Sequence, residues 1–110
     1  MAHWSSHAAF RALSDQTRRD ILTTLQAGPR TSGEIASQFG SSWPTISRHL
    51  AILRESGLVL AERKGQEIYY ELNTSVFQEL VQNLLQWAAP RAGQSRQRAI
   101  KRRRPRPQEG

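Results

Sequence analysis

The chain has 110 residues, no cysteine and a formal net charge of +7. This length allows one small domain and a tail, and the lack of cysteine excludes disulfides, thiolate metal sites and thiol-based redox sensing. No apolar run approaches the roughly 18 residues of a membrane span. The N-terminal sequence lacks the basic and apolar segments of a secretion signal. We therefore expect a cytoplasmic protein that does not insert into a membrane.

The positive charge is confined to the C-terminal end. Residues 1–90 contain eight basic and eight acidic side chains, whereas residues 91–110 contain eight basic side chains and only Glu109 as an acid. We divide the chain accordingly into a domain, 1–90, and a basic tail, 91–110, which is predicted to be disordered because it has so few apolar residues. The tail could add sequence-independent affinity for DNA or RNA through counterion release, or it could only keep the protein in solution.

Two short helices are predicted before residue 30. The first is indicated by apolar residues at roughly helical spacing, namely Trp4, Ala8, Phe10 and Leu13. We expect Ser14 to cap the second helix, with Asp15 in its first turn, and Gly28 to end it. Arg18 and Arg19 fall on or beside the polar face of this second helix. They are either solvated or salt-bridged there, or they contact a phosphate.

A helix-turn-helix is predicted next. Thr31 and Glu34 have the spacing of a capping box, in which each side chain binds the other residue's backbone N–H, and a helix of about eight residues follows as far as Gly40. After a short turn, Ser41 or Ser42 can cap a further helix. Two helices joined by such a turn are typical of this DNA-binding motif.

The helix at residues 42–55 carries the candidate recognition face. Ile46, Leu50 and Leu53 form an apolar stripe that faces a core. The side chains expected to point away from this stripe are Pro44, Thr45, Arg48 and Ile52, with Trp43 and Ser47 on its flank. Arg48 is suited to bind guanine in a major groove. The alternative is an ordinary amphipathic helix with a solvated polar face.

A β-hairpin is predicted directly after this helix. The apolar period changes to two over residues 58–63 and 67–72, and residues 64–66 form the turn between them. Three side chains near the turn can donate hydrogen bonds to DNA: Arg63, Lys64 and Gln66. Such donors suit phosphates or a narrow minor groove. The hairpin is either a DNA-binding wing or a structure whose basic turn is simply solvated.

The last predicted helix is apolar over a wider arc than one small domain can bury. It is capped by Asn73 or Thr74 and ends before Pro90. A helix of this kind usually contacts a partner, and we expect it to form a dimer interface together with the first helix. The residues predicted in this interface are Trp4, Ala8, Phe77, Leu80, Val81, Leu84, Leu85 and Trp87.

Four motifs in this order resemble the ArsR/SmtB family of bacterial winged-helix repressors. They lie at residues 12–22, 44–50, 53–59 and 63–73, within a resembling region of about 8–88. Residues 69–79 are similar to a branch of small autorepressors in this family. The resemblance implies a mainly α fold with a β-hairpin wing (α+β) that dimerises through its first and last helices.

The resemblance also implies a function. Family members are homodimers that bind an inverted-repeat operator in double-stranded DNA over their promoter, with the helix at 42–55 in the major groove and the wing at 63–67 on the backbone or minor groove. A ligand, metal, redox event or partner protein releases the DNA. Trp43, Thr45, Ser47 and Arg48 match base-reading positions, although Trp43 replaces a residue that is usually polar. The predicted DNA-binding set is Ser42, Trp43, Thr45, Ser47, Arg48, His49, Arg63, Lys64 and Gln66.

The family's metal sites are missing from this sequence. Residues 35–38 lack cysteine, and residues 74–88 offer only Glu79 where an Asp, His and Glu set would be needed. His3 and His7 have the i, i+4 spacing of a helical metal pair but no third ligand nearby. We expect His49 to pack or hydrogen-bond beside the apolar stripe. No metal and no cofactor are predicted.

Two other functions compete with an operator-specific repressor. The basic tail could make the chain a sequence-independent nucleic-acid binder in the cytoplasm or at the nucleoid. The winged helix could also have become a protein-interaction module that uses Trp43 as a contact. An enzyme is not expected, because the sequence lacks a carboxylate pair, a Ser/His/Asp set and a phosphate-binding glycine loop. A small ligand and a protein anti-repressor both stay open as the signal that relieves repression.

Overall fold

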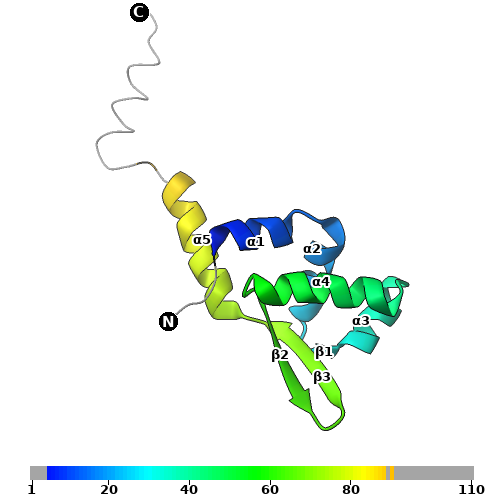
Figure 1. Cartoon of the computed structure of the whole chain (residues 1–110). Helices are drawn as coiled ribbons and strands as arrows, with labels where there is room; N and C mark the ends of the chain where they lie inside the picture. Colours follow the sequence, from blue (N-terminus) through cyan, green and yellow to red (C-terminus); the bar gives the residue numbers. More distant parts are fainter. Residues whose placement is uncertain (1–4, 89, 91–110) are drawn as a thin grey trace, which may run out of the picture. The chain divides into compact units, whose positions relative to one another are not determined.

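The computed structural model describes residues 5–88 and 90. Figure 1 shows the elements, which follow one another as α1 (Ser6–Leu13), α2 (Gln16–Leu25), β1 (Arg30–Thr31), α3 (Ser32–Phe39), α4 (Trp43–Glu55), β2 (Val59–Lys64), β3 (Glu67–Leu72) and α5 (Thr74–Ala88). The chain divides into two compact units, residues 1–80 and 81–110. The helix-turn-helix and the hairpin therefore belong to the first unit, and α5 begins in it. The predicted tail, 91–110, lies outside the described residues.

The cap of α2 differs from the prediction. The Asp15 carboxylate accepts the Arg18 N–H at 3.1 Å and caps α2, whereas Ser14 ends α1 by donating its hydroxyl to the Arg11 carbonyl at 2.6 Å. The prediction that Ser14 caps α2 is therefore wrong. A charged carboxylate is the stronger acceptor at the positive end of a helix. The Arg18 N–H stabilises the ionised form and lowers the pKa of Asp15 from its ordinary value of 3.8.

The helix-turn-helix forms as predicted. In α3 the Thr31 N–H donates to the Glu34 carboxylate at 2.9 Å and the Glu34 N–H donates to the Thr31 hydroxyl at 3.1 Å, which completes the capping box. Gly40 then adopts a φ of 62°, a left-handed conformation that costs glycine little, and ends α3. Ser42 caps α4 by accepting the Thr45 N–H at 3.3 Å.

The core of the first unit is built around α4. Its stripe of Ile46, Leu50 and Leu53 is fully buried among apolar residues from α1, α2, α3, β2 and α5, which confirms the predicted apolar stripe. Ile52, predicted to face outwards, is half-buried against this core. Because α4 contacts β2 as well as α1, α2 and α3, more of its circumference is covered than a stripe of three residues implies.

A short turn fixes where the hairpin leaves α4. Ser56 is fully buried, and its hydroxyl donates to the Leu53 carbonyl at 2.7 Å and accepts the Leu58 N–H at 3.2 Å. Because this hydroxyl both donates and accepts a hydrogen bond, the two bonds offset the cost of removing it from water. The turn thus gives the hairpin a defined start relative to α4.

The sheet has the strand order β1-β3-β2, with both pairings antiparallel. Lys64 pairs with Glu67, which leaves Gly65 and Gln66 as a two-residue loop with Gly65 at a φ of 65°. β2 lies one residue later than the predicted 58–63. The two-residue strand β1 was not predicted, because two residues carry no periodicity. In Figure 1 the β2–β3 hairpin projects away from α1–α4.

The last helix begins where the sequence indicates. Asn73 accepts the Val76 N–H at 3.4 Å, and Val76 and Leu80 are buried in the core of the first unit. Beyond that unit, several large apolar side chains of α5 are exposed: Val81, Leu84, Leu85 and Trp87. No helix among the described residues is long and apolar enough to cross a membrane.

Candidate nucleic-acid interface

The exposed side of α4 forms a shallow hollow of about 540 Å³. It is lined by Trp43, Pro44, Ser47, Arg48 and Ala51, all of them exposed. These positions recur at helical spacing and so share one face of α4, opposite the buried stripe. We call them the reading face. Of the predicted base-reading residues, the structure brings together Trp43, Ser47 and Arg48 on this face.

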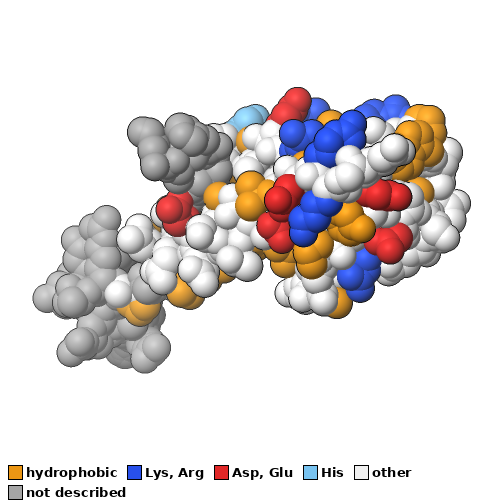
Figure 2. Space-filling model, turned by 90° about the horizontal axis from the view of Figure 1, so that it is seen from below, with side chains coloured by type: hydrophobic (Ala, Val, Ile, Leu, Met, Phe, Trp, Pro, Cys, Tyr) orange, Lys and Arg blue, Asp and Glu red, His pale blue; other side chains and the backbone are white. Residues whose placement is uncertain are grey.

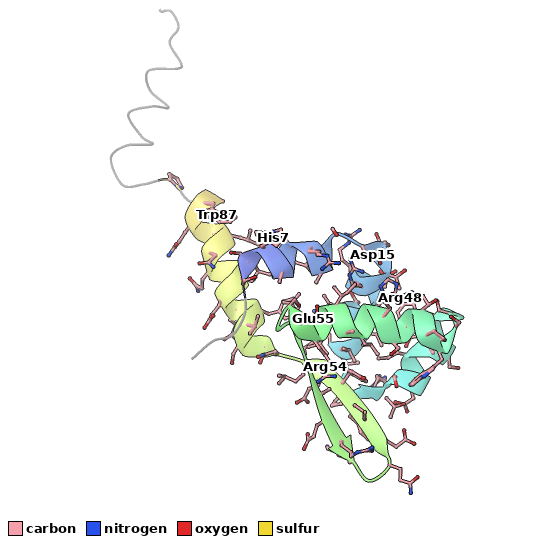
Figure 3. All side chains as sticks on the ribbon, viewed as in Figure 1. His7, Asp15, Arg48, Arg54, Glu55 and Trp87 are labelled. Atoms are coloured by element: carbon pink, nitrogen blue, oxygen red, sulfur yellow. The ribbon has the colours of Figure 1, made fainter. Side chains whose placement is uncertain are left out.

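Arg48 is exposed on the reading face. Its side chain forms no hydrogen bond or ion pair with any residue in the part of the chain that the structure describes. Figure 3 shows Arg48 on α4 towards its N-terminal end, away from Arg54 and Glu55 at the C-terminal end. A guanidinium group with free N–H donors can bind a guanine edge or a phosphate in two-point fashion.

Ser42 and Thr45 hydrogen-bond to each other at the start of α4. The Ser42 hydroxyl donates to the Thr45 hydroxyl at 2.9 Å and accepts the Thr45 N–H, and Thr45 is half-buried. These hydrogen bonds hold the Thr45 side chain at the start of the helix, and its orientation away from the core stays a prediction. Neither residue lines the reading face.

His49 is half-buried, and its ring contacts Arg18 of α2. Its Nδ1 lies 3.2 Å from Nη1 of Arg18, which confirms the expectation that His49 hydrogen-bonds beside the apolar stripe. Arg18 also donates to the Ala12 carbonyl at 2.8 Å and the Arg11 carbonyl at 3.1 Å, and is only 8% exposed. Arg18 was predicted to be solvated, salt-bridged or in contact with a phosphate, and the structure instead buries its guanidinium group against two carbonyls and the His49 ring, so the prediction is corrected. Since α2 contacts both α1 and α4, this part of its surface is covered.

The hairpin tip presents the three predicted wing residues, Arg63, Lys64 and Gln66, all exposed. Lys64 Nζ lies 5.6 Å from the centroid of the Tyr69 ring, a cation–π contact that orients the side chain. The hairpin strands also carry Glu62, Glu67 and Glu71, and Glu67 pairs with Lys64, so acidic side chains flank the two basic residues of the tip. Figure 2 shows acidic and basic side chains intermixed on the face seen from below.

Two residues of the reading face were not assigned to the site from the sequence. Pro44 was placed outside the apolar stripe but given no contact role, and Ala51 was not considered. Their positions relative to Ser47, three residues before it and four after it, contain the signal that would have found them. Both are small and apolar, and sequence reasoning favoured residues with hydrogen-bonding groups.

The predicted dimer residues fall into four groups. Leu80 is 3% exposed and belongs to the protomer core, so its assignment to an intermolecular surface is corrected. Ala8 and Phe77 are half-buried. Val81, Leu84, Leu85 and Trp87 are exposed on α5, and Trp4 lies outside the described residues.

A cavity of about 410 Å³ lies beside α2, and no residue of α4 contributes to its lining. Its lining is mostly apolar and comes from α1, α2, the end of β3 and the start of α5: Leu13, Arg19, Leu22, Thr23, Gln26, Leu72, Thr74, Phe77 and Gln78. This volume lies within the range of small-molecule sites. Among the described residues, no group of three or more His, Cys, Asp or Glu could hold a metal ion; His7 is exposed, and His3 is not described.

Residues 15–60 match the model of the family described as "Bacterial regulatory protein, arsR family". The chain is also 49% identical over 76 residues to the transcriptional repressor SdpR of Bacillus subtilis, a match that covers 69% of this chain and 84% of that protein. This chain is an arsR-family regulator. Members of this family are DNA-binding regulators and not enzymes, which confirms the predicted resemblance and the exclusion of an enzyme.

Two further comparisons agree with the assignment of this arsR-family chain. It is 40% identical to the arsenic resistance transcriptional regulator ArsR2 of Pseudomonas putida, over 76% of this chain and 79% of that protein. Its structure is similar to an ArsR-like transcriptional regulator from Rhodococcus, with a TM-score of 0.74, 31% identity and coverage of 87% of this chain and 89% of that one. The predicted winged helix-turn-helix fold is confirmed.

Proposed function

We propose that this arsR-family protein is a homodimeric repressor that binds an inverted-repeat operator, including one at its own promoter. The reading face of α4 enters the major groove. The observation that supports this best is the exposed Arg48 guanidinium, which has no partner among the described residues. The similarity to a protein named as a transcriptional repressor, SdpR, agrees with it. Action on DNA would place the protein in the cytoplasm, at the nucleoid.

Within this proposal, each residue of the predicted site has a defined role. Trp43, Ser47 and Arg48 face base edges, and Arg63, Lys64 and Gln66 contact the backbone or minor groove at the hairpin tip. Ser42 and Thr45 fix the N-terminal end of α4, where backbone N–H groups favour a phosphate. His49 contacts DNA from the edge of the reading face.

The proposed dimer surface is the exposed apolar face of α5. Val81, Leu84 and Leu85 are each at least 40% exposed and recur at i, i+3 and i+4. A second copy of the chain would remove this surface from water and would place two reading faces on one DNA duplex. Half-site centres would then lie roughly 34–36 Å, or a multiple of this, apart.

Relief of repression by a small ligand or a protein anti-repressor is part of the proposal. The 410 Å³ cavity offers room for a small, largely apolar ligand. It borders one side of α2, and the Arg18 guanidinium on α2 hydrogen-bonds His49 on the recognition helix. A ligand that shifts α2 would therefore act on α4.

One observation favours a second candidate function. The described domain is electrically balanced and all of the excess positive charge lies in residues 91–110, so binding could be driven by the tail without regard to sequence. DNase footprinting on the protein's own promoter, with the full chain and a 1–90 truncation side by side, separates the two. A symmetric protected patch that survives the truncation supports the repressor. Diffuse protection that disappears with the tail supports the alternative, and no protection by either chain supports a protein-interaction module.

A further inference from the structure

The reading face combines one arginine with an unusual amount of apolar surface. Trp43 is 54% exposed, and Pro44 and Ala51 are exposed on the same face. The Trp43 ring has no aromatic or cationic contact among the described residues, so it does not stack on Arg48. Both side chains are therefore available to the same ligand at the same time.

The major groove offers one kind of apolar group, the C5-methyl of thymine. The other base edges carry hydrogen-bond donors and acceptors, which would lose their water without gaining a partner against an indole or proline ring. An apolar half of a reading face therefore discriminates in favour of thymine and against bases that present only polar edges.

The spacing on α4 sets how far these thymines can lie from the guanine. Trp43 precedes Arg48 by five residues, which is about 7.5 Å along the helix axis, close to two base-pair steps of about 3.4 Å each. Pro44 precedes Arg48 by four residues and so neighbours it on the same face. Contacts to a guanine and to methyl groups one or two steps away are compatible with this spacing.

We propose that Trp43 and Pro44 contact the C5-methyl groups of thymines within about two base pairs of the guanine that Arg48 binds. Each half-site of the operator then contains thymine close to guanine, and part of the specificity comes from methyl groups and not from hydrogen bonds. This inference rests on the proposed function, because it requires α4 to lie in the major groove.

The test begins with selection of a binding site from a random DNA library by the full-length protein. Each thymine of the selected half-site is then replaced by uracil, which removes only the methyl group. For a contacted thymine we expect affinity to fall about fourfold, the effect of burying one methyl-sized group. Uracil at the other positions should change affinity by less than about twofold.

Variants connect the effect to particular side chains. Trp43→Gln should bind the thymine and uracil forms of one site equally, and Pro44→Ala should do so at a second thymine. Leu60→Gln is the matched control, because Leu60 is an exposed apolar residue of the hairpin, 46% exposed, outside the reading face. It should retain the full difference between thymine and uracil. Unchanged thermal unfolding of each variant excludes a folding defect.

The outcomes separate the two levels of the proposal. Selection that enriches no symmetric site overturns the proposed function and this inference with it. A symmetric site whose uracil forms bind the wild-type protein as tightly as thymine forms leaves the repressor intact and refutes the methyl contacts. The same holds if Trp43→Gln and Pro44→Ala keep the thymine preference of the wild-type protein.

Discussion

Replacing Arg18 should destabilise the domain far more than replacing its neighbour Arg19. Arg18 is buried and donates to two carbonyls and the His49 ring, whereas Arg19 is exposed and donates to the Leu13 carbonyl and to Gln16 Oε1 at 2.9 Å. The two residues are adjacent on α2 and have the same side chain. They therefore form a matched pair in which burial is the main difference.

The magnitude follows from the partners that Arg18 would leave behind. Three hydrogen bonds from a charged donor contribute about 1.5–3 kcal/mol each, but burying the guanidinium group costs several kcal/mol. We expect Arg18→Ala to lower the free energy of unfolding by about 2–4 kcal/mol, a large share of the roughly 5–15 kcal/mol of a typical domain. Arg19→Ala should cost less than about 1 kcal/mol, because its contacts are screened by solvent.

Urea unfolding followed by circular dichroism, at one fixed protein concentration, measures both losses. Arg18→Met serves as a further control, since it keeps most of the apolar stem and removes only the donors. Equal losses for Arg18→Ala and Arg19→Ala would refute the reasoning. An Arg18→Met variant as stable as the wild-type protein would show that the three hydrogen bonds contribute no net stability.

The remaining predictions concern the DNA contacts, the helix cap and the dimer. Arg48→Ala should lose roughly 1–3 kcal/mol of operator affinity with little change on random DNA, and equal losses in a titration on both DNAs would exclude base reading. Lys64→Ala should weaken binding to all sequences alike and reduce the slope of log affinity against log salt by about one; an unchanged slope would argue against a phosphate contact. The folded pKa of Asp15 is lowered, so its stabilisation is present above the unfolded pKa near 3.8 and is lost as the pH falls through the folded pKa. The stability advantage of the wild-type protein over Asp15→Asn should therefore fade on acidification, and thermal unfolding that shows a constant difference would contradict this. Leu85→Glu should convert the proposed dimer into monomers in analytical ultracentrifugation, and a dimer that persists would place the interface elsewhere.

Elements with a repeated local signal were predictable from the sequence. The capping box at Thr31, the buried stripe of α4 and the alternation of the hairpin strands each depend on residues a few positions apart, so their periodicity is visible in one chain. The two-residue strand β1 has no such signal, because only its pairing with β3 defines it. This strand therefore depends on tertiary structure and not on a local sequence pattern.

The wrong predictions for individual residues also arise from tertiary contacts that a local pattern does not show. Arg18 and Ile52 were assigned from the pattern of their own helices, but other elements cover them. Leu80 continues the apolar arc of α5 in sequence, yet it lies in the protomer core while Val81 is exposed. Which residues of an apolar helix face are buried within the protomer depends on the elements that pack against the helix. The spacing of apolar residues in the helix itself does not identify those elements.

The contact between Arg18 and His49 favours one tautomer of a side chain on α4. A guanidinium group carries donors only, so Nδ1 of His49 must supply the lone pair for the 3.2 Å contact. The ring hydrogen of the neutral imidazole then resides on Nε2. Any DNA group that approaches Nε2 of His49 therefore meets a donor. Arg18, a buried residue of α2, thus determines whether His49 on α4 offers a donor or an acceptor at its other ring nitrogen.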